Sequence, residues 1–271
     1  MDVINCHVHT KYSHDGKGTV REICNEAVKN HLSGFAVTDH CDCEYADDKK
    51  MYKSLLCSFD EVFEASKEYG NTPLIIKGIE IGEAIYNPVF AKEIISARSW
   101  DMVLGSVHAV RYKNYEMPFS VIDFTSWQED ALYSYIRQYF EDVKETVLTA
   151  DFDILSHLTV IYRYIIYKYN RSIDTSVFLP QIEEILKSVI TQGKTLEVNT
   201  SGMVSGYLMP DADILRLYKS LGGNDISVGS DSHSPENLCL GINEAVNILR
   251  ELGFSHLTHY IGRKPYKTSI K

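Results

Sequence analysis

Histidine and carboxylate side chains recur in this sequence directly after short apolar runs. His7 and His9 follow the first run, and Asp231 and His233 follow one near the end of the chain. Side chains two positions apart in an extended strand point the same way, so each pair can share one ion. One such pair is weak evidence, because two ordinary polar residues at a strand end give the same pattern.

The pattern repeats at four further apolar runs, which strengthens it. The residues that close these runs are His40 in FAVTDH, Glu80 in IIKGIE, His108 in MVLGSVH and His157 in FDILSH. Imidazole nitrogens combined with carboxylate oxygens are typical ligands of Zn²⁺, Fe or Mn²⁺, and neither Cys41 nor Cys43 lies in a clear ligand position. Together these residues indicate a divalent-metal site assembled from several strands.

The segments that must position these residues alternate between two kinds. Strands are expected at 3–6, 34–38, 74–79, 102–107, 153–156, 195–198 and 226–229. Helical periodicity is found at 20–30, 52–69, 89–96, 127–148, 180–192, 211–221 and 236–252. Strand–helix alternation with right-handed crossovers favours a parallel sheet, and seven units favour a closed α/β barrel. In such a barrel the carboxyl ends of the strands meet at one rim, where active sites lie.

Composition narrows the class of protein. The chain has 271 residues and a formal charge of −10 with no basic cluster, which argues against a general nucleic-acid binder. No basic segment followed by an apolar stretch opens the sequence, and no apolar run approaches the roughly 18–20 residues that cross a bilayer. We therefore expect a single domain over 1–271, without a membrane partner, in the cytoplasm.

These motifs resemble those of the polymerase and histidinol phosphatase (PHP) family, and most closely its monofunctional histidinol-phosphate phosphatase branch. The matching segments are HVHTKYSHDG at 7–16, TDH at 38–40, GIE at 78–80, SVH at 106–108, SH at 156–157, EVNTSG at 197–202 and GSDSH at 229–233. The resemblance covers nearly the whole chain. It implies a distorted seven-stranded (β/α)7 TIM-like barrel that holds three divalent metal ions.

The resemblance also implies which residues hold each ion, with Glu80 shared between two of the three sites. The first set is His7, His9, Glu80 and Asp231; the second is Glu80, His108 and His157; the third is Asp15, His40 and His233. One position departs from the family pattern, because Asn5 stands where an aspartate is usual. An uncharged Asn5 would polarise the imidazole of His7 less than a carboxylate would.

The implied reaction is hydrolysis of a small phosphate monoester, with histidinol phosphate as the expected substrate. A hydroxide bridging the two ions that share Glu80 is the expected nucleophile, and no Gly-x-Ser-x-Gly motif offers a serine instead. His14 and His233 are candidate proton donors to the leaving group. Arg163 and Arg111 are candidate ligands of the phosphate, because a planar guanidinium pairs well with phosphate oxygens.

Three further features have open interpretations. The tyrosine-rich segment 158–169 could be a lid over a pocket or an amphipathic segment packed on the barrel. The loop 199–210 leaves the same rim and could contact substrate. Glu83 or Glu44 could pair with the ammonium group that histidinol phosphate carries.

Other functions remain compatible with the residues. A phosphoesterase of the same family could act on phosphotyrosine or a nucleotide, since loops determine substrate choice. A barrel that keeps metal ions for stability or binding is a second alternative, although all nine expected ligand positions are filled here. An amidohydrolase-like barrel also uses His-x-His on its first strand, but it normally bridges its metals with lysine where this chain has Glu80.

Overall fold

A computed structural model describes residues 3–43, 49–113 and 117–270, and its centre is a parallel sheet. The strands are β1 (Ile4–Val8), β2 (Gly34–Val37), β3 (His40–Asp42), β4 (Leu74–Gly82), β5 (Met102–Ser106), β6 (Ile154–Leu155), β7 (Thr195–Asn199) and β8 (Ile226–Gly229). They are ordered β1-β2-β4-β5-β6-β7-β8, with β3 paired to the second half of β4. The α/β barrel of seven strands expected from the sequence is confirmed.

The barrel nearly closes where β8 returns to β1. Just beyond β8, the amide of Asp231 donates to the carbonyl of His7 over 2.9 Å, and the amide of His9 donates to the carbonyl of Ser232 over 2.8 Å. The buried side chain of Asn5 links the same two strands. Its Nδ2 donates to Ser230 Oγ, and its Oδ1 accepts from the amides of Ser230 and His7.

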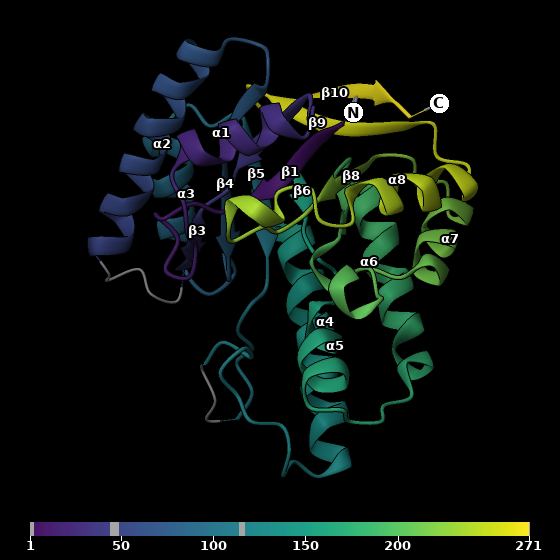
Figure 1. Cartoon of the computed structure of the whole chain (residues 1–271). Helices are drawn as coiled ribbons and strands as arrows, with labels where there is room; N and C mark the ends of the chain where they lie inside the picture. The colour runs from purple at the N-terminus through teal and green to yellow at the C-terminus, as the bar shows by residue number, and fades with distance from the viewer. Residues whose placement is uncertain (1–2, 44–48, 114–116, 271) are drawn as a thin grey trace.

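Helices surround the barrel and cover the outer faces of the strands (Figure 1). They are α1 (Val20–Lys29), α2 (Lys49–Tyr69), α3 (Pro88–Ala97), α4 (Glu129–Thr149), α5 (Val160–Tyr162), α6 (Leu179–Thr191), α7 (Ala212–Ser220) and α8 (Ile242–Glu251). Two carry strong start signals: Thr19 and Glu22 form a reciprocal capping box at α1, and the Asp211 carboxylate caps α7. None of the helices within the described ranges has the length and hydropathy that a bilayer span requires.

Apolar side chains form two cores on opposite sides of the sheet. The larger core lies between strands and helices, and includes Phe35, Ile79 and Leu196. A smaller core fills the barrel near the beginnings of the strands; its members are Ile4, Cys6, Ala36, Ile76, Met102, Leu104, Ile154 and Tyr260. The apolar filling therefore occupies one end of the barrel interior and leaves the other end for polar side chains.

Several boundaries differ from the sequence-based expectations. Strand β3 was not expected, and β4 runs past Glu80 to Gly82, so that Glu80 lies within a strand and not at its end. The helix expected at 236–252 is a 3-10 turn, Pro235–Asn237, followed by α8, because Gly241 adopts a positive φ of 66° between them. Segment 158–169 is α5 continued by a π-helix over Arg163–Lys168.

The C-terminal hairpin was also missed, since its short strands read as polar surface. Strands β9 (His256–Ile261) and β10 (Lys264–Ser269) pair antiparallel and lie across the top of the barrel in Figure 1. Tyr260 reaches Thr195 at the start of β7 over 2.9 Å, and the Gly262 amide donates to Asp101 just before β5. The hairpin therefore covers the end of the barrel where the strands begin.

Replacing Asn5 with Ala should destabilise the metal-free protein by about 3 kcal/mol, because buried main-chain amides of β1 and β8 lose their acceptor. Urea unfolding of the metal-free protein measures this difference. Asn247→Ala, an exposed asparagine on α8, is the control and should cost less than about 1 kcal/mol. Equal effects of the two substitutions would contradict a role for Asn5 in closing the barrel.

Candidate metal centre

An irregularity in β1 turns His7 and His9 into the barrel. Ile4 and Cys6 face the inner core, so strict alternation would point His7 outward. The pairing of β1 with β2 shifts register between Asn5 and Val8, and such a bulge re-aims the residues that follow it. His7 and His9 both end fully buried, with their Nε2 atoms 3.1 Å apart.

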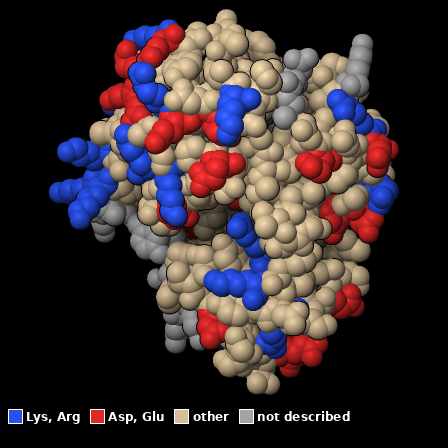
Figure 2. All heavy atoms as spheres, viewed as in Figure 1, with Lys and Arg blue, Asp and Glu red and all other residues tan. Residues whose placement is uncertain are grey.

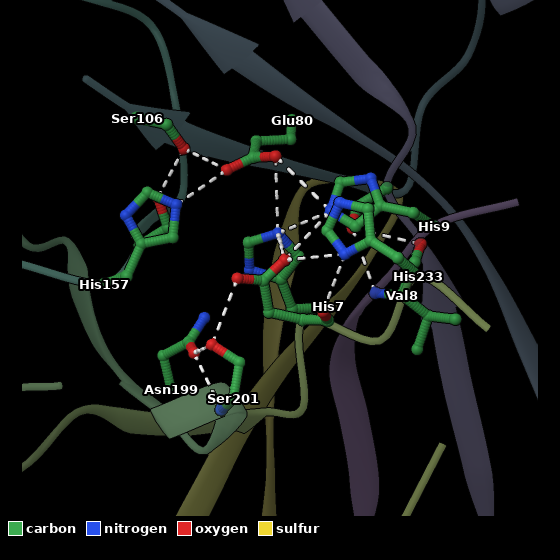
Figure 3. A network of polar contacts seen from close by, with 12 residues as sticks. His7, Val8, His9, Glu80, Ser106, His157, Asn199, Ser201 and His233 are labelled. Carbon is green, nitrogen blue, oxygen red and sulfur yellow. Dashed lines mark hydrogen bonds and ion pairs between the residues drawn. The ribbon is translucent and has the colours of Figure 1, made fainter. Parts of the chain in front are cut away.

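Glu80 reaches the same region by simple alternation along β4. Ile76 belongs to the inner core, and four residues later the side chain of Glu80 points into the barrel with no exposed surface. The hydroxyl of Ser106 on β5 donates to Glu80 Oε1 over 2.5 Å and is itself in contact with Ser156 (Figure 3). These hydroxyls fix the orientation of the carboxylate.

The first expected ligand set is assembled in the structure. Glu80 Oε2 lies 3.4 Å from His7 Nε2 and 3.5 Å from His9 Nε2. Asp231 Oδ1 lies 3.6 Å and 3.3 Å from the same two nitrogens. Four ligand atoms from β1, β4 and the end of β8 therefore face one another.

The second set of expected ligands faces Oε1, the other carboxylate oxygen of Glu80. Glu80 Oε1 is 3.2 Å from His108 Nε2 and 3.0 Å from His157 Nε2, and these two nitrogens are 3.3 Å apart. The two oxygens of Glu80 thus face separate groups of imidazoles. This is the arrangement that a carboxylate bridging two ions needs.

The third set lies nearer the surface. His233 Nε2 is 3.5 Å from His40 Nε2 and 3.2 Å from Asp15 Oδ2, and His40 Nε2 is 3.7 Å from Asp15 Oδ1. His40 also contacts the centre, since its Nδ1 lies 2.8 Å from Glu80 Oε2. The structure therefore brings all nine expected ligands together in the three expected groups.

The spacing of these atoms fits metal ions. Ligand atoms that sit about 2.0–2.2 Å from one tetrahedral ion lie about 3.3–3.6 Å from each other. The separations above are close to that range. In addition, Glu80 Oε2 is buried without a well-aligned hydrogen bond among the described residues, although imidazole nitrogens of His7, His9 and His40 lie within 3.5 Å of it, and a bound ion would satisfy this oxygen. Nitrogen and carboxylate ligands without a thiolate suit Zn²⁺, Fe or Mn²⁺.

Charges in the centre shift the pKa values of its groups in opposite directions. Burial raises the pKa of Glu80, but the charges of His7, His108 and His40 outweigh this and hold it well below its usual range. Burial lowers the pKa of His7, yet the charge of Glu197 contributes to raising it well above normal. The metal-free centre therefore carries ionised carboxylates that are compensated by protonated imidazoles.

Residues outside the three expected ligand groups hold three of the imidazole rings in place, and the sequence did not predict them. Glu197 on β7 lies 2.8 Å from His7 Nδ1, and Asp42 on β3 lies 3.1 Å from His108 Nδ1. A hydrogen bond at Nδ1 leaves Nε2 facing the centre, so these carboxylates set the tautomer and the aim of each ring. Glu197 lies on the inner face of β7, a position that alternation along the strand could have revealed.

His9 is held through a hydroxyl rather than directly by a carboxylate. Its Nδ1 lies 3.0 Å from Ser13 Oγ, which donates to Asp39 Oδ1 over 2.8 Å. Asp39 also accepts hydrogen bonds from Thr10 and from Ser58 on α2. The loop that follows β1 is thereby tied to β2 and to a helix outside the barrel.

The expected role of Asn5 needs correction. Its side chain bonds main-chain atoms and Ser230, and the partner of the His7 ring is Glu197. Gly229 makes room for that contact: a Cβ there would lie 2.2 Å from Glu197 Oε1 and 2.5 Å from His7 Cβ. The absence of charge at Asn5 therefore does not remove the carboxylate that polarises His7.

Two of the expected ligands have unusual backbone conformations. His157 has a φ of 22° and Asp231 a φ of 50°, although neither is glycine. The His157 amide donates to Glu197 Oε2 over 2.7 Å, and the Asp231 amide donates to His7. Neighbouring side and main chains therefore impose these conformations, as is common at functional sites.

A cavity of about 1080 Å³ opens above the ligand groups, and Figure 2 shows the hollow on this face of the molecule. His14 and Arg163 lie on its wall, with the His14 side chain 71% exposed. Arg163 Nη1 donates to Ser201 Oγ over 3.1 Å and lies 3.9 Å from Asp231. Arg111 is not among the described lining residues, because its guanidinium lies over the ring of Tyr86.

Two acidic residues, Glu83 and Glu44, were expected as candidates to pair with a substrate ammonium group, and the structure describes one of them. Glu83 is fully buried, and its Oε1 accepts hydrogen bonds from the amides of His108 and Ala109. It therefore positions the loop after β5 and does not face the cavity. Glu44 lies outside the described residues.

Both segments with open interpretations contribute to the cavity. Val160, Arg163 and Tyr164 from segment 158–169 line it, while Ile161 and Ile165 of the same segment are packed in the core. The segment is thus both a cavity wall and part of the barrel packing. Loop 199–210 supplies further lining residues: Ser201, Val204, Ser205 and Tyr207.

The barrel and its ligand groups define a metal-binding protein of the PHP type. A family model described as the PHP domain matches residues 5–201. The chain therefore belongs to the PHP-domain family.

Named relatives are of similar length to this chain. The histidinol-phosphatase of Lactococcus lactis subsp. lactis is 26% identical over 289 residues and is covered completely in both chains. A "Probable histidinol-phosphatase" of Thermotoga maritima is 27% identical over 263 residues, which is 94% of each chain. The crystal structure of the L. lactis histidinol phosphate phosphatase, complexed with zinc, L-histidinol and phosphate, superposes with a TM-score of 0.76 at 24% identity. It covers 98% of this chain and 99% of that one, which confirms the fold.

Metal binding should release protons and should strengthen as pH rises. Burial lowers the pKa of His40, but the charge of Glu80 outweighs it and raises the pKa to about 9. A group with a raised pKa is protonated below that pH, so an ion must displace the proton there. Affinity should fall about tenfold per pH unit below pH 9 for each proton displaced.

Calorimetric titration of the metal-free protein with Zn²⁺, in buffers of different ionisation enthalpy, measures the protons released. Release at pH 7 should exceed release at pH 9.5, since fewer imidazoles are protonated at the higher pH. Equal release at both values would contradict protonated imidazoles in the metal-free centre.

Proposed function

We propose that this protein is a metal-dependent phosphomonoesterase that hydrolyses histidinol phosphate to histidinol and phosphate. The observation that carries the proposal is the pair of ligand groups on the two oxygens of Glu80, with a third group beside them at the floor of a cavity. The substrate follows from the relatives, whose names specify histidinol-phosphatase and which match this chain over nearly their whole length.

Divalent ions in the three groups would supply Lewis acidity toward phosphate oxygens and would activate water for attack on phosphorus. The chain contributes the positions of those charges. Glu80 keeps its negative charge although it is completely buried, and Ser106 holds its orientation. Glu197 and Asp42 hold the rings of His7 and His108 in the orientation that presents Nε2.

Arg163 is the residue best placed to bind the phosphate from the wall of the cavity. Its Nη1 lies beside Ser201 and Asp231 at the edge of the first ligand group. A guanidinium there can donate to phosphate oxygens and adds positive charge to a protein of net charge −10. Arg111, stacked on Tyr86, is less suited to this role.

His14 is the better of the two proposed proton donors. His233 is engaged at both nitrogens, since Nδ1 lies 2.9 Å from the Asp231 carbonyl and Nε2 faces Asp15. His14 lies on the cavity wall with a mostly exposed ring, where it can exchange protons with water. When the P–O bond breaks, the leaving alkoxide takes up this proton.

Two alternative functions are less well supported. Phosphotyrosine or a nucleotide could occupy a cavity of this volume, but the named relatives point to histidinol phosphate. A barrel that only stores metal has no need for an arginine beside the first ligand group or for a large cavity above it. We further propose that the chain acts as one domain over 1–271, and in the cytoplasm, where its six free cysteines would stay reduced.

The purified metal-loaded protein should hydrolyse histidinol phosphate with a higher kcat/KM than phosphotyrosine or a nucleoside monophosphate. Glu80→Gln should lower kcat at least about 100-fold, because an amide nitrogen cannot ligate a second ion. Released phosphate and bound metal per chain are the two measurements. Higher kcat/KM on another ester would overturn the substrate, and full activity of the Glu80→Gln protein would overturn the mechanism.

Arg163→Ala should raise KM for the phosphate ester about 10–100-fold, because a charge-assisted contact to the phosphate is lost. Arg111→Ala is the matched control and should change KM less than about threefold. Steady-state kinetics on both variants, with metal content measured in parallel, makes the comparison. A larger effect at Arg111 would reverse the assignment of the two arginines.

A further inference from the structure

Two segments form one wall of the cavity, and they are joined at two points. The π-helix Arg163–Lys168 follows β6, and the 3-10 turn Ser201–Ser205 follows β7. The inner junction is polar: Arg163 Nη1 donates to Ser201 Oγ, whose hydroxyl lies 2.6 Å from Asn199 Oδ1 and 3.4 Å from Asp231 Oδ2. Arg163 is thus connected to a residue of the first ligand group.

The outer junction is an aromatic stack. The rings of Tyr167 and Tyr207 lie with centroids 3.7 Å apart and an angle of 7° between their planes. Tyr207 lines the cavity, whereas Tyr167 is absent from the described lining and is 50% exposed. The half-exposed ring of Tyr167 thus stacks on a cavity residue of another segment and belongs to neither apolar core of the described residues.

Local geometry fixes Tyr207 in place. Gly206 ends the 3-10 turn with a φ of 80°, and the chain then reverses so that the Tyr207 ring covers Gly202. A Cβ at Gly202 would lie 2.2 Å from that ring. The ring of Tyr207 is therefore packed against its own loop and also stacks on Tyr167.

The π-helix carries one residue of each junction, so both junctions depend on the same segment. Arg163 and Tyr167 are four residues apart, and both contact the loop after β7 from the same segment. π-helical turns are rare and are often found at functional sites. Apart from the outer contact, a hydrogen bond to Ser201 holds the Arg163 side chain to that loop, and the same hydroxyl also contacts Asn199 and Asp231.

We infer that the Tyr167–Tyr207 stack is a positioning device that clamps the β6 and β7 segments together and thereby holds Arg163 in the orientation that receives a phosphoryl group. Neither tyrosine is a catalytic residue in this scheme. The inference rests on the proposed function only in requiring that a phosphate binds at the metal centre. It assigns to a partly exposed aromatic pair an effect on phosphate affinity, with little effect on the rate of the chemical step.

Binding of inorganic phosphate to the metal-loaded protein tests the inference, together with KM and kcat for histidinol phosphate. Tyr167→Ala and Tyr207→Ala should each weaken phosphate binding and raise KM about 3–10-fold, the range expected for loss of one aromatic stack. Values of kcat should stay within about twofold and metal content should not change. Tyr207→Phe keeps the stack and should behave as the unmodified protein.

The double variant separates a clamp from two independent contacts. If stacking of the two rings is what holds Arg163 in place, the double variant should lose little more phosphate affinity than either single variant loses. Tyr266→Ala is the control, because Tyr266 is a half-exposed tyrosine on β10 that is stacked on His259. It should leave phosphate binding unchanged.

Three outcomes would overturn the inference. They are normal phosphate binding by Tyr167→Ala, a loss in Tyr207→Phe equal to that in Tyr207→Ala, or fully additive effects in the double variant. The second outcome would mean that the Tyr207 hydroxyl contacts the ligand itself. If the protein binds phosphate but does not turn over histidinol phosphate, the proposed substrate fails while the binding series still tests the clamp.

Discussion

The buried carboxylate of Glu80 is the interaction on which the site depends. Five imidazole nitrogens lie within 3.5 Å of its two oxygens; they belong to His7, His9, His40, His108 and His157. An ionised carboxylate without exposed surface costs several kcal/mol unless positive charge compensates it. The imidazoles of His7, His40 and His108, whose pKa values are raised, supply that charge in the metal-free protein, and bound ions would supply it when the imidazoles become neutral ligands. The same negative charge is therefore compensated in the metal-free fold and favours metal binding.

This charge compensation requires strands from the whole chain to end at one place. Closure of the barrel brings these strand ends together. His7 lies on β1 and Asp231 just beyond β8, and the two meet only because main-chain hydrogen bonds and the Asn5 side chain join these strands. Outer carboxylates then aim the rings. Glu197 contacts both the His7 ring and the His157 amide, so that one side chain positions residues of two of the expected ligand groups.

The sequence was sufficient to predict the barrel, and the residues that end its apolar runs lie close together because parallel strands share one rim. The grouping of nine expected ligands, including Asp15 from a loop, came from the family resemblance, and the structure brings these residues together. What it could not provide depends on register and tertiary contact. The bulge that turns His7 inward is a shift in pairing between β1 and β2, and nothing in the residue types marks it. Glu83 reads as a free acid in the sequence, yet the fold buries it against main-chain amides. The hairpin β9–β10 was missed because its strands have few apolar residues.

The floor and the wall of the cavity are built from different kinds of structure, and this division has a functional consequence. The floor comes mainly from strand residues and strand ends of the parallel sheet, with Asp15 added from the loop after β1, so most distances between the expected ligands are set by the sheet. The wall comes from a π-helix and a 3-10 turn, which are joined by Arg163, Ser201 and one pair of stacked rings. Changes in the wall can alter which phosphate ester fits without disturbing the metal ligands. Substitutions in these two segments are therefore one way in which substrate choice can change while the metal centre is kept.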